Sequence, residues 1–269
     1  MVWLNFLHLY QPIHADPYVV EEATEKCYKE LVKILEDHPN LNFTFNITGC
    51  LILRWRELGY TALIKRVKDL VKSGQIELVG SAAYHPLLPL IPEKEAESQI
   101  KENTKILHDN FGKDISLKGF FFPEMAYSPR VANLVGKMGF EWVILDELAY
   151  SGNLSKLPRA GGIYIDAHSG LRVIFRSRKL SNDYVPRVIN KEIKEGNRRK
   201  VSVTATDGEL YGLRHQDKEN ELENMAGNKK ITTDIISHYI ESAKINGKRK
   251  MISCSWESSP QELKQKEPY

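Results

Sequence analysis

Two carboxylates stand at positions where they could do chemistry. Glu124 follows the apolar run from Phe120 to Pro123, and Asp207 follows the β-type run from Val201 to Thr206. A carboxylate where an apolar strand meets its loop is partly desolvated. Its charge therefore needs a hydrogen-bonding or ionic partner, or the residue has a functional role. Acids at the carboxyl ends of separate strands of a β/α barrel can serve as nucleophile and proton donor. We therefore interpret these two residues as a catalytic pair.

Each carboxylate taken alone also has a structural explanation. Glu124 could be an acid placed ahead of a helix that begins at Ser128-Pro129. Asp207-Gly208, with Glu209 beside it, could be a turn that follows a strand. Two such acids at strand ends of one apparent sheet favour chemistry over these alternatives.

Two histidines lie near the same strand ends. His8 closes the first apolar run, and His85 lies in a proline-rich apolar loop over residues 82–92, so both could line a sugar-sized pocket. A hydrogen-bonded core histidine is the alternative for each. Aromatic side chains near strand ends, such as Tyr10 and Trp256, could stack on sugar faces, although most aromatic residues of this kind are core packing.

Several other chemistries lack their sequence motifs. The chain has no GxGxxG, GxxxxGK[ST] or GxSxG motif, which argues against dinucleotide, P-loop and serine-hydrolase sites. It also has no HxxxH, HExxH or Cys/His cluster, so a zinc site would have to be assembled from scattered ligands. We expect neither a metal nor an organic cofactor.

The composition is that of an ordinary globular protein. With 269 residues the chain is long enough for one large α/β domain, and its 42% hydrophobic and 27% charged residues are close to soluble averages. A net charge of +3, from 38 basic and 35 acidic residues, is too small to indicate a nucleic-acid surface. We interpret the dense basic runs at residues 198–200 and 248–250 as solvated turns.

The sequence indicates a soluble protein of the cytoplasm. The three cysteines form no CxxC pair, and an odd number cannot be fully paired within the chain. The N-terminus begins directly as a strand, without the pattern of a signal peptide, and no stretch approaches the roughly 20 apolar residues of a membrane span. The oligomeric state stays open.

Strand and helix signals alternate along the chain. The expected strands cover residues 3–10, 41–45, 76–80, 117–122, 142–145, 201–205 and 251–254. Helical spacing or caps predict helices over residues 19–36, 47–58, 92–111, 129–138 and 232–245, and a further helix that ends at Ser73-Gly74. A hairpin insertion is expected at about residues 161–176. This alternation predicts parallel β/α wrapping in a single domain over residues 1–269.

Four separated motifs resemble those of glycoside hydrolase family 57, in the same order and at similar spacing. They are His8-Leu9-Tyr10-Gln11-Pro12, Gly74 to Leu78 with His85 to Pro89, Phe122-Pro123-Glu124, and Thr206-Asp207-Gly208-Glu209. The resemblance covers nearly all of the chain and is greatest to shorter members described as α-amylase-like or α-mannosidase-like. It implies an α/β fold, an incomplete (β/α)7 barrel, and a retaining glycosidase or transglycosylase that acts on α-linked glucans or related oligosaccharides.

The resemblance also implies roles for residues at the motif positions. Glu124 corresponds to the nucleophile and Asp207 to the general acid/base. The residues that line or support the sugar site are His8, Tyr10, Glu77, His85 and Glu209, together with Trp256 as a pocket residue of this subgroup. Many members have a second histidine where this chain has Tyr10. Members also carry a helical region with a fifth motif after the barrel, which we expect to be truncated here because the chain stops at Tyr269.

Two other functions remain open from the sequence. A metal-dependent polysaccharide deacetylase has a similar barrel but uses an Asp and two His on a metal, and its paired-Asp and HxxxH motifs are not in this chain. A non-catalytic glycan-binding barrel is the second alternative.

Overall fold

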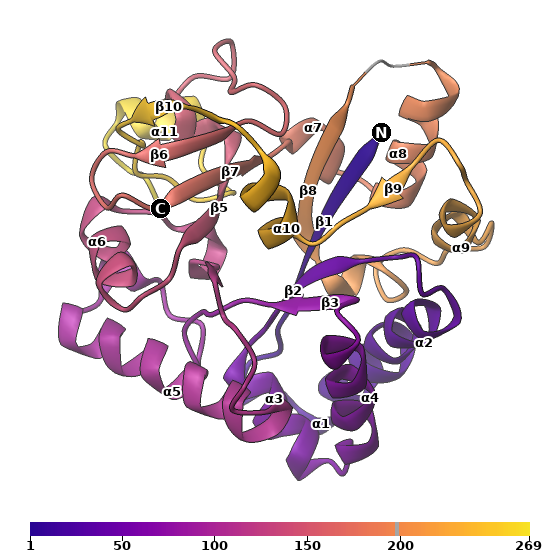
Figure 1. Ribbon diagram of the computed structural model, residues 1–269. Coiled ribbons are helices and arrows are strands. Elements are labelled where there is room, and N and C mark those ends of the chain that lie inside the picture. The colour runs from indigo at the N-terminus through magenta and orange to yellow at the C-terminus, as the bar shows by residue number, and fades with distance from the viewer. Residues whose placement is uncertain (197–198) are drawn as a thin grey trace.

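Seven parallel strands form the barrel in the part of the chain that the computed structural model describes, residues 1–196 and 199–269 (Figure 1). Four strands pair in the order β3-β2-β1-β8, and three pair in the order β4-β5-β7. These strands are β1 (Val2–Leu9), β2 (Phe43–Ile47), β3 (Ile76–Leu78), β4 (Gly119–Phe120), β5 (Trp142–Asp146), β7 (Arg172–Arg176) and β8 (Val201–Asp207).

The two groups of strands join differently on their two sides. A parallel bridge between Gly80 and Phe120 connects β3 to β4. Between β7 and β8, the described backbone makes a single direct hydrogen bond, from Ser177 N–H to the Val203 carbonyl at 2.9 Å. The barrel is therefore incomplete at the β7–β8 seam, and the expected α/β fold with an incomplete seven-stranded barrel is confirmed.

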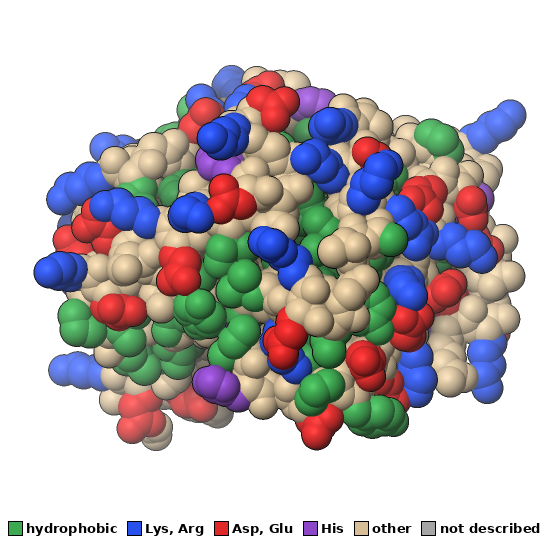
Figure 2. Space-filling model, turned by 90° about the horizontal axis from the view of Figure 1, so that it is seen from below, with side chains coloured by type: hydrophobic (Ala, Val, Ile, Leu, Met, Phe, Trp, Pro, Cys, Tyr) green, Lys and Arg blue, Asp and Glu red, His purple; other side chains and the backbone are tan. Residues whose placement is uncertain are grey.

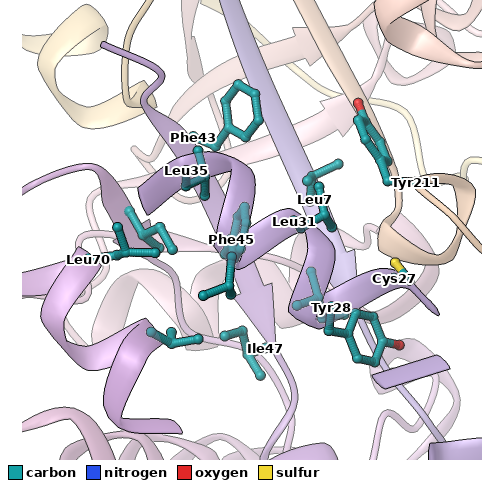
Figure 3. Packing of buried hydrophobic residues seen from close by; sticks show 14 of the residues in the cluster. Leu7, Cys27, Tyr28, Leu31, Leu35, Phe43, Phe45, Ile47, Leu70 and Tyr211 are labelled. Atoms are coloured by element: carbon teal, nitrogen blue, oxygen red, sulfur yellow. The ribbon is translucent and has the colours of Figure 1, made fainter. Parts of the chain in front are cut away.

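Alternation along the strands divides the apolar side chains between two layers. One cluster fills the barrel interior and includes Phe6, Ile144 and Ala205. Alternate residues such as Leu7 and Phe45 point outward into clusters that pack under the helices. Figure 3 shows this outer packing, where Leu31 and Leu35 of α2 and Leu70 of α4 lie against β1 and β2.

Helices cover the outside of the barrel (Figure 1). They are α1 (Pro17–Ala23), α2 (Lys29–Asp37), α3 (Gly49–Glu57), α4 (Thr61–Lys72), α5 (Glu93–Phe111), α6 (Pro129–Lys137), α7 (Arg178–Ser181), α8 (Val185–Lys194), α9 (Glu221–Ala226), α10 (Ile236–Ser242) and α11 (Pro260–Lys264). Ile236 and Ile240 of α10 belong to the interior cluster, so this helix plugs the barrel. None of the described helices combines the length and apolarity that crossing a membrane requires.

The helix caps that the sequence indicates are present. The Ser128 hydroxyl accepts from the Val131 N–H at the start of α6, and Pro129 occupies the first helical position. The helix expected over residues 19–36 is continuous but contains a π turn at Thr24–Tyr28 between α1 and α2. Figure 2 shows acidic and basic side chains interspersed over the face that it draws, in agreement with the small net charge.

Three predictions near the C-terminal half need correction. The hairpin forms, with β6 (Ile163–Asp166) antiparallel to β7, but β7 is itself a barrel strand rather than an insertion. Residues 251–254 are not a strand: their apolar side chains are buried, yet only Cys254 bridges, antiparallel to Tyr127. The helix predicted to reach Ile245 ends at Ser242.

The exposed residues after α10 pair instead with β6. This segment is β10 (Ile245–Arg249), so its basic residues lie on an edge strand and not in a turn. β9 (Thr232–Thr233) pairs with the start of β1, which shortens the predicted helix at its other end. Both pairings are non-local and leave no periodic signal in the sequence. Of the other basic run, Arg198 lies outside the described residues.

Candidate active site

The carboxyl ends of the strands converge on one hollow. His8 of β1 is in register with Asp207 of β8 and with Asn46 of β2, so their side chains share one level of the barrel. A hollow of about 330 Å³ opens above them. It is lined by His8, Tyr10, Gln11, Pro12, Glu124, Asp207, Glu209, Arg214, Trp256 and Glu257. Six of the eight residues that the sequence assigned to the site therefore lie together.

Glu124 has a side-chain partner at each of its two carboxylate oxygens. Its backbone is left-handed, with φ 57°, which is uncommon for a non-glycine residue and turns the side chain toward the site. His85 Nε2 lies 2.8 Å from Oε1, and Trp256 Nε1 donates to Oε2 at 2.7 Å. Burial works to raise the pKa of Glu124, but the His85 and Trp256 contacts outweigh it and hold the pKa below its usual value. The group is thus an ionised carboxylate.

His85 joins Glu124 to the other histidine of the site. Its ring stacks on His8, with the ring centroids 4.6 Å apart, and on Tyr10 at 4.3 Å. An ionised carboxylate can only accept, so His85 presents a proton on Nε2 to Glu124. His85 lines the site from behind the carboxylate, as the seventh of the eight assigned residues to lie there.

His8 is a neutral imidazole with one free lone pair. Its Nδ1 lies 2.7 Å from Oδ1 of Asn46, which as an amide oxygen can only accept, so this contact assigns the proton to Nδ1. Burial, reinforced by the electrostatic influence of the neighbouring His85, lowers the pKa of His8 to about 3. His8 Nε2 is buried and has no partner among the described residues. That atom is therefore available to accept a hydrogen bond from a ligand hydroxyl.

Asp207 and Glu209 have environments opposite to that of Glu124. Burial raises the pKa of Asp207, the nearby charge of Glu124 adds to the effect, and Arg214, which donates to Oδ2 at 2.8 Å, opposes it. Glu209 accepts from Gln11 Nε2 at 2.7 Å and from the Tyr28 hydroxyl. Burial dominates over these donors and raises the pKa of Glu209 to about 7. One ionised acid thus faces two that hold protons more strongly.

Trp256 is held in place by Arg176, whose segment the family resemblance places at the border of the cleft, and by Arg178 and Asp146, which the sequence did not reveal. Arg176 lies over the Trp256 ring, 5.1 Å from its centroid, and both Arg176 and Arg178 donate to the buried carboxylate of Asp146. Asp146 stands at the end of the apolar strand β5, as Asp207 does in β8, and this position is the signal that could have identified it.

Glu77 is the one assigned residue that the structure places elsewhere. It is in register with Thr44, two residues before the level of Asn46, and it lines a separate hollow beside α10. Its carboxylate accepts from Thr44 Oγ1 at 2.9 Å, from Ser237 N–H at 3.2 Å and from the Ser237 hydroxyl. Glu77 therefore contacts the plug helix α10 and does not line the hollow that contains Glu124 and Asp207.

A group of potential metal ligands lies at the hollow that His8 and Glu124 line. Ligand atoms of His8, His85 and Glu124 all lie within 4.8 Å of one another. Two imidazoles and one carboxylate are a donor set that suits zinc. The three residues come from distant parts of the sequence, so no local motif could indicate the cluster.

Comparison with known proteins identifies the relatives of the chain. The sequence profile of glycosyl hydrolase family 57 matches residues 4–241. Alpha-amylase 1 from Dictyoglomus thermophilum is 26% identical over 215 residues, which cover 77% of this chain and 31% of that enzyme. The chain thus spans about a third of that relative.

Solved structures show the same fold. The 4-alpha-glucanotransferase from Thermococcus litoralis superposes with a TM-score of 0.83 at 23% identity, over 95% of this chain and 41% of that chain. A polysaccharide deacetylase structure from Mycobacterium smegmatis, described as putative, superposes with a TM-score of 0.62 at 11% identity, over 89% of this chain and 88% of the other. At these identities the likeness concerns the fold alone.

The Trp256 contact to Glu124 can be tested without turnover. Trp256→Phe removes the indole N–H that stabilises the ionised carboxylate, so we expect the pKa of Glu124 to rise. The measurement is a pH titration of the Glu124 carboxyl carbon by ¹³C NMR. Trp142→Phe is the control, because that indole donates to Ser237 and not to the site. An unchanged Glu124 titration in Trp256→Phe would contradict the assigned contact.

Glu209 predicts how stability depends on pH. Its folded-state pKa of about 7 exceeds the ordinary value of 4.5, so between these pH values the unfolded chain releases a proton that the folded protein retains. The free energy of unfolding should therefore fall as pH rises through this window, by up to about 3 kcal/mol. In Glu209→Gln the fall should become smaller, and what is left comes from other buried acids with a raised pKa, such as Asp207.

Urea unfolding at a series of pH values measures this effect. Glu219→Gln, which changes an exposed acid outside the network, should keep the wild-type dependence. A Glu209→Gln profile that parallels the wild type would show that Glu209 is not the group responsible.

Proposed function

The chain belongs to glycosyl hydrolase family 57, and from this premise we propose that its barrel carries a retaining glycosidase or transglycosylase site for α-linked glucans. The observation that carries the proposal is the meeting of Glu124 and Asp207 in one hollow, in environments that drive their pKa values apart. Such a pair, one ionised and one inclined to keep its proton, is what the two roles in retaining catalysis require.

The reaction would proceed in two displacements. Glu124 attacks the anomeric carbon and forms a covalent glycosyl-enzyme, while Asp207 gives its proton to the departing glycosidic oxygen. Asp207, now ionised, then takes a proton from water or from an acceptor hydroxyl, whose oxygen displaces Glu124 from the sugar. Both carboxyl groups thereby return to their starting protonation states. Water as acceptor gives hydrolysis, and a sugar hydroxyl gives transfer.

The rest of the hollow suits a sugar. His8 Nε2 would accept from a sugar hydroxyl, which accounts for a buried nitrogen without a protein partner. Tyr10 and Trp256 would contact the sugar faces, and His85 would keep Glu124 oriented. The α-amylase and 4-alpha-glucanotransferase relatives support an α-glucan substrate. Because the chain matches about a third of that α-amylase, the proposal concerns the barrel's site.

Replacement of each carboxylate by its amide tests the assignment of nucleophile and proton donor. Glu124→Gln should lower glucan turnover by about 10³-fold or more, because the amide cannot form the glycosyl-enzyme. Asp207→Asn should lose turnover of natural glucans yet retain it on glycosyl fluorides, whose leaving group needs no protonation. Product analysis by size and by anomeric ¹H NMR measures turnover, transfer and retention of configuration.

An exposed acid outside the hollow provides the control for these substitutions. Glu93→Gln, which changes an exposed acid in the first turn of α5, should leave turnover unchanged. Full activity of Glu124→Gln on every glucan that the wild type cleaves would refute the nucleophile assignment. Binding of maltooligosaccharides by the unaltered chain without any product would favour a non-catalytic glycan-binding barrel.

A metal-dependent deacetylase is the second candidate. It is favoured by the cluster of His8, His85 and Glu124 and by the fold shared with the deacetylase structure. In that function a cation would occupy Glu124 and both imidazoles, so that Glu124 could not act as a nucleophile. The glycosidase proposal predicts less than stoichiometric zinc in the purified protein and turnover that resists chelators. Stoichiometric zinc that His8→Gln abolishes, with release of acetate from acetylated chitooligosaccharides, would establish the deacetylase instead.

A further inference from the structure

Arg214 makes an unexpected contact with the proposed proton donor. Its Nη1 donates to Oδ2 of Asp207 at 2.8 Å, although 59% of the Arg214 side chain is exposed, against 28% for Asp207. The backbone of this loop is fixed, since the Arg214 N–H donates to the Glu209 carbonyl at 2.8 Å. Gly212 has φ 131°, and a Cβ there would lie 2.0 Å from the Lys26 carbonyl oxygen. Only the long Arg214 side chain is thus free to turn.

Arg214 and Asp207 both line two neighbouring hollows. The first is the proposed sugar site that contains Glu124. The second, of about 190 Å³, is lined in part by Ser181, Asn182 and Thr206. Asp207, Arg214, Trp256 and Glu257 line both hollows. If the reacting sugar lies beside Glu124, its leaving group or acceptor must lie next to Asp207, where the Arg214 guanidinium now is.

The Arg214–Asp207 contact opposes the proposed role of Asp207 as proton donor. A guanidinium at hydrogen-bond distance favours the ionised carboxylate, and it occupies one of the two oxygens that could hold the proton. Exposed ion pairs are weak, however, and change equilibria by about fivefold at most. A sugar hydroxyl can therefore compete with Arg214 for this carboxylate.

We propose that Arg214 is a displaceable counter-ion of Asp207, and that a sugar entering the second hollow takes its place at the carboxyl oxygen. Arg214 would then determine how well leaving-group and acceptor sugars bind, and the second hollow would take neutral, hydroxyl-rich rings through polar groups such as Asn182 and Glu257. The inference rests on the proposed function for the identity of the sugar, but the ion pair can be tested without it.

The surroundings of Asp207 determine the direction of the pKa change expected in the first test. Burial and the charge of Glu124 raise the pKa of Asp207, whereas Arg214 and His85 lower it, and Glu209 and Glu257 also line the hollow. Removal of the Arg214 charge should therefore raise the pKa of Asp207 in the free protein. ¹³C NMR titration of the Asp207 carboxyl carbon in wild type and Arg214→Gln measures this change.

Arg66→Gln provides the matched control for the titration. Arg66 also pairs with a carboxylate at the surface, with Nη2 2.7 Å from Glu36 Oε2, but neither residue lines the site. The Asp207 titration should be the same in Arg66→Gln as in wild type. An Asp207 pKa that does not rise in Arg214→Gln would overturn the proposal.

Binding of maltotetraose tests the displacement itself. Because the sugar no longer competes with the guanidinium, Arg214→Gln should bind maltotetraose roughly two- to fivefold more tightly than wild type in calorimetry. In wild type, saturation should move the Arg214 Nε–H signal to the position of a free arginine. Unchanged or weaker binding by Arg214→Gln, or an Arg214 signal that does not move, would overturn the proposal.

Failure of the proposed function is distinguishable from failure of this inference. If neither protein binds maltotetraose while the free-protein titration still shows the Asp207–Arg214 pair, the substrate class is wrong and the displacement by sugar is overturned with it. If maltotetraose binds equally well to both proteins, the glucan site stands and only the role of Arg214 is refuted.

Discussion

The site depends on one buried carboxylate shared by two guanidinium groups. Asp146, whose side chain is fully buried, accepts from Arg176 Nε at 2.8 Å and from Arg178 Nε at 2.6 Å. A buried charge is tolerated only when it is paired and hydrogen-bonded, so the three residues must stay together. They lie at the seam where β7 and β8 hardly pair, and Arg176 Nη1 donates across it to the Ala205 carbonyl at 3.0 Å. A side chain thus replaces backbone pairing where the barrel is open.

The same arginines connect the seam to Glu124. Arg178 Nη2 donates to the Ser258 carbonyl at 2.7 Å, and Arg176 lies over the Trp256 ring. Trp256 in turn donates its backbone N–H to the Glu124 carbonyl at 3.1 Å and its indole N–H to the Glu124 carboxylate. The segment after β10 has no strand ladder of its own, so these side-chain contacts position it. The same two arginines consequently stabilise the open seam and help to orient Glu124 through Trp256.

The sequence predicted the features that local residue patterns indicate. It missed the features that depend on the position of a residue along the barrel axis or on contacts between residues far apart in the sequence. Carboxylates at strand ends were visible, and Glu124 and Asp207 do share a hollow. Asp146 has the same signal, but its partners are Arg176 of β7 and Arg178 of α7. The sequence suggests that β7 is half of a hairpin insertion, and β6 does pair with it antiparallel. The family resemblance assigned Glu77 to the sugar site through its motif position, yet Glu77 lies at the level of Thr44 and faces α10. Depth along a barrel axis has no counterpart in residue type or spacing.

Opposed environments of similar carboxyl groups decide which one can act as an acid. Glu124 is only partly buried, with 38% of its side chain exposed, and it has donors at both oxygens, so its charge is supported by His85 and Trp256. Asp207 is more enclosed, with 28% of its side chain exposed, and apart from its donor Arg214 it has Glu124 as a neighbour of like charge. Burial without enough donors favours the protonated form, whereas donors at each oxygen favour the ion. In the proposed mechanism, the donors at both oxygens of Glu124 suit a nucleophile, and the enclosure of Asp207 suits a proton donor.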